Sequence, residues 1–372
     1  MNIYKLIIVF ASLALILTIA SSSTNSLAWA EPIHIISTRN HFDQFGNLIP
    51  NRPSYEPFPF DFGSMGCTQE ALIYVHGVWT AKDKVNEGIK DMFESAPEVF
   101  DRARLSLESM GYTFPVIGFS WDSDTEISPN GWYYAKIIAK ENGPKLAQFI
   151  LDLKDNCPQT KIRLIAHSLG ARVVLSSLDS LNNNQIWNNN NFKIASVHLM
   201  GAAVDDDEVS KNSADVLSSD GIRSAYGKAI EEEVSYFYNL FNLEDDALEP
   251  GYVYPLYFDC FNYSENQPVY YPCFEQDFAL GQKGIQSTIF DRDVPQNYVD
   301  IPVEQEILNI RDADADRGCD LIYPSFWSPD FVCTITQVGD NHLGYVGFRG
   351  PDNSLRDNGA MSVVAYTLQN ST

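Results

Sequence analysis

The stretch of sequence that decides the fold is KIRLIAHSLGARVVL, at residues 161–175. It opens with a short apolar run, which predicts a strand buried on both faces. It continues with apolar residues at helical spacing, which predict a helix. Between the two lies Ala-His-Ser-Leu-Gly, a variant of the G-x-S-x-G elbow in which Ala166 replaces the first glycine. Such a turn exposes its serine, so we predict that Ser168 is a nucleophile; the alternative is a structural turn without chemistry.

Similar short apolar runs recur along the chain and predict an α/β fold. They are apolar on consecutive residues, as in the buried strands of a parallel sheet, rather than on alternate ones. The runs lie at residues 71–75, 116–119, 194–200 and 234–243. Apolar residues at helical spacing within 132–153 and 171–181 predict the crossover helices that parallel strands require. We therefore predict a mostly parallel, doubly wound sheet whose carboxyl strand ends carry the reactive groups.

The elbow and its surroundings resemble the α/β-hydrolase superfamily, and within it the lipase- and esterase-like members with an Ala-His-Ser-Leu-Gly elbow. The segment LIYVHGVW at 72–79 is similar to the family's strand and oxyanion loop, and GFSWD at 118–122 is similar to its next strand. The resemblance covers roughly residues 70–248 and a short region around His342. It implies the α/β-hydrolase fold and a triad in the chain order serine, acid, histidine.

The order implied by this resemblance points to one base. Of the six histidines, only His342 follows the candidate acids, and it lies in a glycine-punctuated loop. We expect His342 to be the base; the alternative is an ordinary surface histidine. His198 lies inside a predicted strand, so we expect it to be a core residue. His167 neighbours the nucleophile, but we expect its side chain to point elsewhere on the turn.

The acid must end a strand and hydrogen-bond the base, which holds the imidazole in one tautomer and stabilises the imidazolium. By resemblance, an aspartate three residues before a leucine is the usual form, and Asp245 stands so to Leu248. We expect Asp245 to be the acid. Asp246 and the aspartates of 205–207 are the alternatives, and for that cluster we prefer a solvated loop cap.

Two backbone N–H groups are expected to form an oxyanion hole. The N–H of Leu169 follows the nucleophile and begins a helix, whose dipole favours an anion there. The resemblance to lipases places the second donor on Val78, where Gly77 lets the chain approach the substrate closely. The alternative is that His-Gly is only a turn that ends a strand.

The composition and the first residues indicate an exported protein. Residues 1–30 combine a lysine, an apolar run and a terminal Ala-Trp-Ala, which is typical of a secretory signal peptide; an uncleaved membrane anchor is the alternative. We expect residues 31–372 to form a single α/β-hydrolase domain outside the membrane. The formal net charge of −24 disfavours nucleic acid and anionic lipid as partners.

An even number of cysteines in an exported chain predicts disulfides, and a zinc site is the weaker option because no C-x-x-C pair occurs. In the superfamily the strand before the oxyanion loop lies beside the elbow strand. This places Cys67 and Cys157 at the amino ends of neighbouring strands and favours their pairing. Placement along the chain suggests Cys260 with Cys273 and Cys319 with Cys333 as the remaining pairs.

Residues 248–335 are rich in aromatic residues, proline and aspartate, and we expect a disulfide-stapled insertion between the acid strand and the catalytic histidine. Its aromatic residues either line a substrate pocket under a lid or form the insertion's own core. Alternating aspartates within it present oxygen ligands as calcium loops do. The expected ligands of a structural calcium ion are Asp312, Asp314, Asp316 and Asp320. A solvated acidic loop is the alternative.

Together these features predict a secreted serine hydrolase that acts on small-molecule or lipid carboxylic esters through an acyl-enzyme and needs no cofactor for catalysis. Peptidase, amidase or acyltransferase chemistry would use the same residues. A catalytically inactive relative that serves as a binding protein at the cell surface is the alternative from another class.

Overall fold

The computed structural model of the chain describes residues 33–57, 60–81, 95–126, 128–216, 222–245, 247–248, 263–264, 267–268, 278–285, 293–303, 323–324, 331–332, 342, 344–349 and 355–371. The expected signal peptide at 1–30 lies outside these residues, as do the four expected calcium ligands and most of the expected insertion.

The described part of the chain is built on a seven-stranded sheet in which every neighbouring pair is parallel. Its strands in chain order are β1 (His34–Ser37), β2 (Glu70–Val75), β3 (Val116–Ser120), β4 (Lys161–His167), β5 (Ile194–Met200), β6 (Val234–Phe241) and β9 (Tyr298–Pro302). Their order across the sheet is β1-β3-β2-β4-β5-β6-β9. The predicted α/β class and parallel sheet are therefore confirmed.

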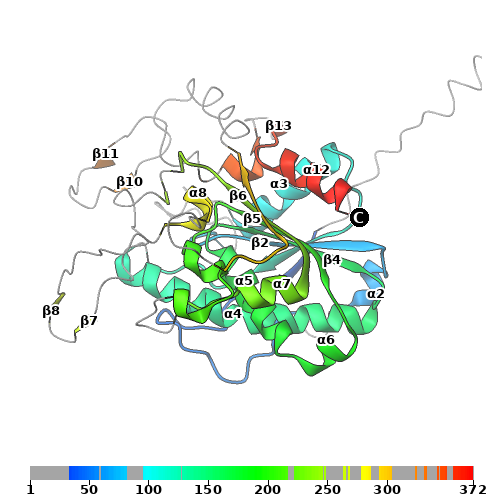
Figure 1. Cartoon of the computed structure of the whole chain (residues 1–372), viewed down its shortest axis with the longest axis horizontal. Helices are drawn as coiled ribbons and strands as arrows, with labels where there is room; N and C mark the ends of the chain where they lie inside the picture. Colours follow the sequence, from blue (N-terminus) through cyan, green and yellow to red (C-terminus); the bar gives the residue numbers. More distant parts are fainter. Residues whose placement is uncertain are drawn as a thin grey trace, which may run out of the picture. The chain divides into compact units, whose positions relative to one another are not determined.

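Helices cover both faces of this sheet, which is why the central strands are apolar on consecutive residues. The helices are α3 (Ala96–Ser109), α4 (Pro129–Asn156), α5 (Gly170–Asn182), α6 (Gln185–Asn189), α7 (Gly227–Glu233) and α12 (Met361–Asn370). In Figure 1, α4, α5 and α7 lie along one face and α3 and α12 along the other, matching two separate clusters of buried apolar side chains. No helix of the described residues has the length and apolar character needed to cross a membrane.

Shorter elements complete the described chain. They are α2 (Phe62–Met65), η2 (Asp206–Val209), η3 (Ser213–Asp215), α8 (Leu280–Lys283) and η5 (Gly344–Val346), with three two-stranded ribbons formed by β7 (Tyr263–Ser264) and β8 (Gln267–Pro268), β10 (Tyr323–Pro324) and β11 (Phe331–Val332), and β12 (Phe348–Arg349) and β13 (Leu355–Asp357). Segments 298–302 and 331–332, which lie within the expected insertion, form strands, and the first of them extends the main sheet.

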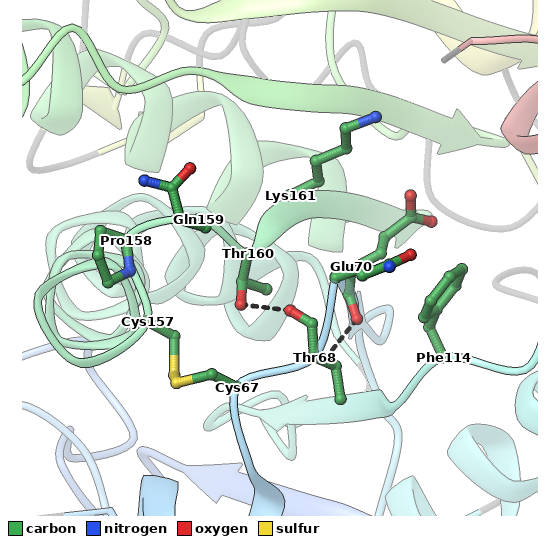
Figure 2. A pocket seen from close by; sticks show the side chains of 10 residues that line it. Cys67, Thr68, Glu70, Phe114, Cys157, Pro158, Gln159, Thr160 and Lys161 are labelled. Atoms are coloured by element: carbon green, nitrogen blue, oxygen red, sulfur yellow. Dashed lines mark hydrogen bonds between the residues drawn. A yellow bond between two sulfur atoms is a disulfide. The ribbon is translucent and has the colours of Figure 1, made fainter.

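A disulfide joins Cys67 to Cys157, as predicted, with their Cα atoms 5.3 Å apart. It connects the segment before β2 to the end of α4, so it fastens the amino ends of β2 and β4 to each other. The hydroxyl of Thr160 also donates to the carbonyl oxygen of Thr68 at 2.6 Å (Figure 2). The other four cysteines lie outside the described residues.

We predict that the double substitution Cys67→Ala and Cys157→Ala lowers the free energy of unfolding by about 2–4 kcal/mol, since a cross-link across 90 residues restricts the unfolded chain. Denaturant unfolding of both proteins measures the change. A variant that unfolds at the wild-type midpoint would show that the cross-link leaves stability unaffected.

Candidate active site

The elbow holds Ser168 between the end of β4 and the start of α5, in a left-handed conformation with φ of 54°. A non-glycine residue pays strain for this conformation, which is typical of a functional turn. Gly170 is required because a Cβ there would lie 2.6 Å from the carbonyl oxygen of His76 and 2.7 Å from that of Val75. Ala166 lies within β4, between Val75 of β2 and Leu199 of β5, where a strand accepts a methyl group readily.

The structure brings the three predicted catalytic side chains into one hydrogen-bonded chain. His342 Nε2 lies 2.8 Å from Ser168 Oγ, and its Nδ1 lies 2.8 Å from Asp245 Oδ2. A carboxylate only accepts, so Nδ1 carries the ring proton and leaves Nε2 free to accept the serine hydroxyl. Asp245 is fully buried, whereas the His342 side chain keeps 13% of its surface exposed. Asp246, the alternative acid, lies outside the described residues.

Backbone contacts position the acid beside the base. Asp245 follows β6, and its backbone N–H donates to the carbonyl oxygen of Asn242 at 3.0 Å. Gly201, at the end of β5 with φ of 54°, lies against it: a Cβ there would come within 3.2 Å of the Asp245 carboxylate and 2.8 Å of the Tyr345 ring. Gly201 was not among the predicted site residues, although a glycine directly after a buried strand is a signal of such a close approach.

The two expected oxyanion donors flank Ser168. Leu169 caps the amino end of α5, and Val78 follows Gly77 in the loop after β2. Within the described chain, neither backbone N–H donates to another protein group. A Cβ on Gly77 would lie 2.8 Å from the Cβ of Ser168, so only glycine allows the loop to approach the nucleophile this closely.

Two hydrogen bonds fix the peptide that carries the Val78 N–H. The Gly77 carbonyl oxygen accepts from His76 Nδ1 at 2.8 Å and from the Thr80 hydroxyl at 3.1 Å. In a trans peptide the N–H points opposite to the C=O. Because the Gly77 carbonyl is bound inside the loop, the Val78 N–H is directed away from these partners.

Arg39 holds this loop, and no sequence pattern indicated this role. Its Nη2 donates to the Thr80 carbonyl oxygen at 2.7 Å and lies 3.2 Å from His76 Nε2, which also accepts the backbone N–H of Trp121 at 3.1 Å. Burial, and then the charge of Arg39, hold the pKa of His76 well below its usual range, so this ring stays neutral. No linear motif connects Arg39 to His76, 37 residues away.

His167 does not point away from the site, contrary to our expectation. Its Nε2 lies 2.7 Å from the backbone carbonyl oxygen of His342, and the two ring centroids are 4.8 Å apart. Burial, and secondarily the neighbouring His342, lower the pKa of His167 to about 3. His198 is a core residue of β5, as expected, with its Nε2 2.8 Å from the Thr367 hydroxyl.

The acidic cluster after β5 is buried, so our interpretation of it as a solvated loop cap is wrong. Asp205, Asp206 and Asp207 are at most 4% exposed. Glu208 in η2 pairs through both carboxylate oxygens with Arg172 of α5, at 2.6 and 2.9 Å, and both side chains are fully buried. Buried carboxylates need compensating charge. The pair between Glu208 and Arg172 therefore joins the acidic segment to α5, the helix that follows the elbow.

A cavity lies apart from this site. Figure 2 shows this cavity at the amino ends of β2 and β4, whereas Ser168 follows the carboxyl end of β4. The cavity is lined by Cys67, Thr68, Gln69, Glu70, Phe114, Cys157, Pro158, Gln159, Thr160 and Lys161. Within the described residues no group of three or more His, Cys, Asp or Glu side chains is arranged to hold a metal ion. The expected calcium ligands Asp312, Asp314, Asp316 and Asp320 lie outside them.

The parallel sheet, with Ser168 in a turn after β4 and Asp245 in the segment after β6, defines an α/β-hydrolase fold. Residues 86–239 match the model of a family described as "Alpha/beta hydrolase of unknown function (DUF900)". No match was found among curated proteins.

Several solved structures are similar to parts of the chain. A Trichoderma reesei cutinase in complex with a C11Y4 phosphonate inhibitor shares 20% identity, covering 37% of this chain and 52% of that one, with a TM-score of 0.25. The catalytic core domain of acetyl xylan esterase from Trichoderma reesei shares 10%, covering 47% and 84%, with a TM-score of 0.28. Aspergillus fumigatus lipase B shares 12%, covering 50% and 39%, with a TM-score of 0.28. The match thus spans about half the length of the cutinase.

Proposed function

We propose that this protein is a secreted serine hydrolase that cleaves carboxylic esters of small molecules or lipids through an acyl-enzyme. The observation that carries the proposal is the continuous chain from Ser168 through His342 to Asp245, with both hydrogen bonds at 2.8 Å. A serine hydroxyl is a weak nucleophile on its own, and a base within hydrogen-bond reach, oriented by an acid, activates it.

In the proposed reaction, Ser168 Oγ attacks the ester carbonyl carbon while its proton passes to His342 Nε2. The tetrahedral intermediate collapses as the C–O bond to the alcohol breaks, and the imidazolium returns the proton to the leaving oxygen. Water then attacks the acyl-enzyme by the same steps, which releases the acid and regenerates Ser168. The buried carboxylate of Asp245 holds the proton on Nδ1 and stabilises the imidazolium.

The negative charge that develops on the carbonyl oxygen would be bound by the N–H groups of Leu169 and Val78. Removal of one such donor costs on the order of 3 kcal/mol of transition-state stabilisation. The Leu169 N–H lies at the start of α5, where the helix dipole favours an anion. No cofactor enters any step, because protein groups alone perform each proton transfer.

Labelling with a fluorophosphonate probe, together with a panel of p-nitrophenyl and lipid esters, tests the proposal. We expect the folded protein to be labelled at Ser168 and to hydrolyse esters, and the Ser168→Ala variant to do neither. Absence of labelling and of turnover in the folded wild type would reject the enzymatic function and leave a binding protein. Turnover of amides or peptides in preference to every ester would reject the ester specificity.

Arg39 supplies a further prediction. The Arg39→Met variant should lose about tenfold to a hundredfold in kcat for ester hydrolysis, because the loop that directs the Val78 N–H would lose its anchor at the Thr80 carbonyl. Active-site titration with the phosphonate corrects the rate for the folded fraction. As a control, Arg52→Met removes a half-exposed arginine that lies 3.8 Å from Glu56, and kcat should be unchanged. Equal rates in the two variants would contradict the role of Arg39.

A further inference from the structure

His167 presents a buried polar contact that the serine, the base and the acid do not require. It is the last residue of β4, directly before the nucleophile, and only 7% of it is exposed. Its Nε2 meets the carbonyl oxygen of His342 at 2.7 Å. A carbonyl oxygen only accepts, so His167 Nε2 carries a proton and donates it.

We propose that His167 is a positioning residue that holds the base: its Nε2–H binds the backbone of His342 and keeps the imidazole aligned with Ser168 and Asp245. The inference rests on the proposed function for its catalytic meaning. The contact joins two parts of the chain separated by 175 residues, the rigid end of a central strand and the stretch that carries the base.

The geometry favours a specific hydrogen bond from His167 to the backbone of His342 over a role of His167 in core packing alone. The two bonds of the His342 ring, to Ser168 and to Asp245, involve only its side chain. The bond from His167 supplies a third point of attachment. On its other side the His167 ring lies against the oxyanion loop, since a Cβ on Gly77 would be 3.3 Å from its Nδ1. One side chain therefore binds the backbone of the base and faces Gly77 of the oxyanion loop.

The charge state of His167 suits this role. Burial lowers the pKa of His167 to about 3, so its ring is uncharged at neutral pH. When His342 takes the serine proton it becomes an imidazolium, and a second cation with its ring centroid 4.8 Å away would oppose that step. A neutral donor holds the base without this repulsion.

Substitution of His167 tests the proposal in the full chain. In His167→Leu we expect kcat to fall about tenfold to a hundredfold with little change in KM, because a small displacement of the base weakens proton transfer. His167→Gln, which can place an amide N–H near the Nε2 position, should recover most of the loss. The proton NMR signal of His342 Nδ1–H, identified by its absence in Asp245→Asn, should remain in the wild type and His167→Gln and be lost or shifted in His167→Leu.

His198→Leu is the matched control, because His198 is another buried histidine whose pKa burial lowers to about 3 and whose Nε2 bond is 2.8 Å long. We expect it to lose stability while keeping kcat and the Nδ1–H signal. If His167→Leu behaves in the same way, the proposal is wrong. If His167→Leu does not fold, His167→Asn, whose shorter amide cannot reach the His342 carbonyl, takes its place; equal kcat and signal in Asn and Gln variants would also overturn it.

The NMR measurement separates this inference from the proposed function. A wild type that shows the Nδ1–H signal but neither reacts with the phosphonate nor hydrolyses an ester would reject the function. Loss of the signal in His167→Leu would still support the hold on His342 in that protein. Active wild type with an unaffected His167→Leu variant would reject the hold and leave the function intact.

Discussion

Replacing Ser168 with alanine is expected to lower kcat for ester hydrolysis by about 10⁴- to 10⁶-fold while leaving the fold intact. The variant loses the atom that forms the acyl-enzyme, and no other described side chain is within hydrogen-bond distance of His342 Nε2 to replace it. His342→Ala should lose a similar factor, because an un-ionised serine is a poor nucleophile. The double variant should be no slower than either single one, since the two residues act as one unit.

Ser177→Ala provides the matched control for this experiment. Ser177 is a buried serine of α5 whose hydroxyl donates to the Val174 carbonyl oxygen at 2.7 Å. Its removal should leave kcat unchanged. Measurement of kcat and KM with an activated ester compares the wild type with these four variants, and turnover by Ser168→Ala at the wild-type rate would contradict the assignment of the nucleophile.

Replacing Glu208 with glutamine is expected to lower the free energy of unfolding by about 3–5 kcal/mol. The Glu208 and Arg172 side chains are both fully buried and joined by two hydrogen bonds. The substitution removes the negative charge and leaves the guanidinium in a low-dielectric environment without its compensating partner. Burial and the charge of Glu208 also raise the pKa of Asp205, so removal of the Glu208 charge would also change the pKa of Asp205.

Glu108→Gln is the control for the effect of burial. Its ion pair with Arg104 on α3 has an equally short distance of 2.7 Å, but Glu108 is 42% exposed, and the cost should be below about 1 kcal/mol. Denaturant unfolding measures both changes. Equal losses in the two variants would show that burial of the Arg172 pair does not determine its contribution.

The parts of the fold that the sequence predicted are those with a strong periodic pattern. Consecutive apolar residues identified the central strands because helices bury both of their faces. The edge strand β9 was missed because Tyr298–Pro302 contains an aspartate, ends in proline and is only partly buried, so it resembles a loop. Edge strands lack the apolar signal that double burial produces.

The residues of the candidate site also separate into those that the sequence predicted and those that it did not. Ser168 lies in a local motif, and the family's order along the chain implied His342 and Asp245. The structure places these three in contact. Arg39 and the orientation of His167 could not be predicted, because each acts through a contact between residues far apart in sequence and neither changes the local periodicity.

The cross-link between Cys67 and Cys157 lies at one end of two neighbouring strands whose other ends lead to Val78 and Ser168. The strands pair over six residues, and this paired length of about 20 Å lies between the disulfide and the proposed chemistry. A parallel pair can slide only if both ends move, and the disulfide prevents this at one end. The disulfide therefore fixes the register of β2 and β4. We expect its reduction, although remote from the substrate, to loosen the alignment of the nucleophile with the oxyanion donor.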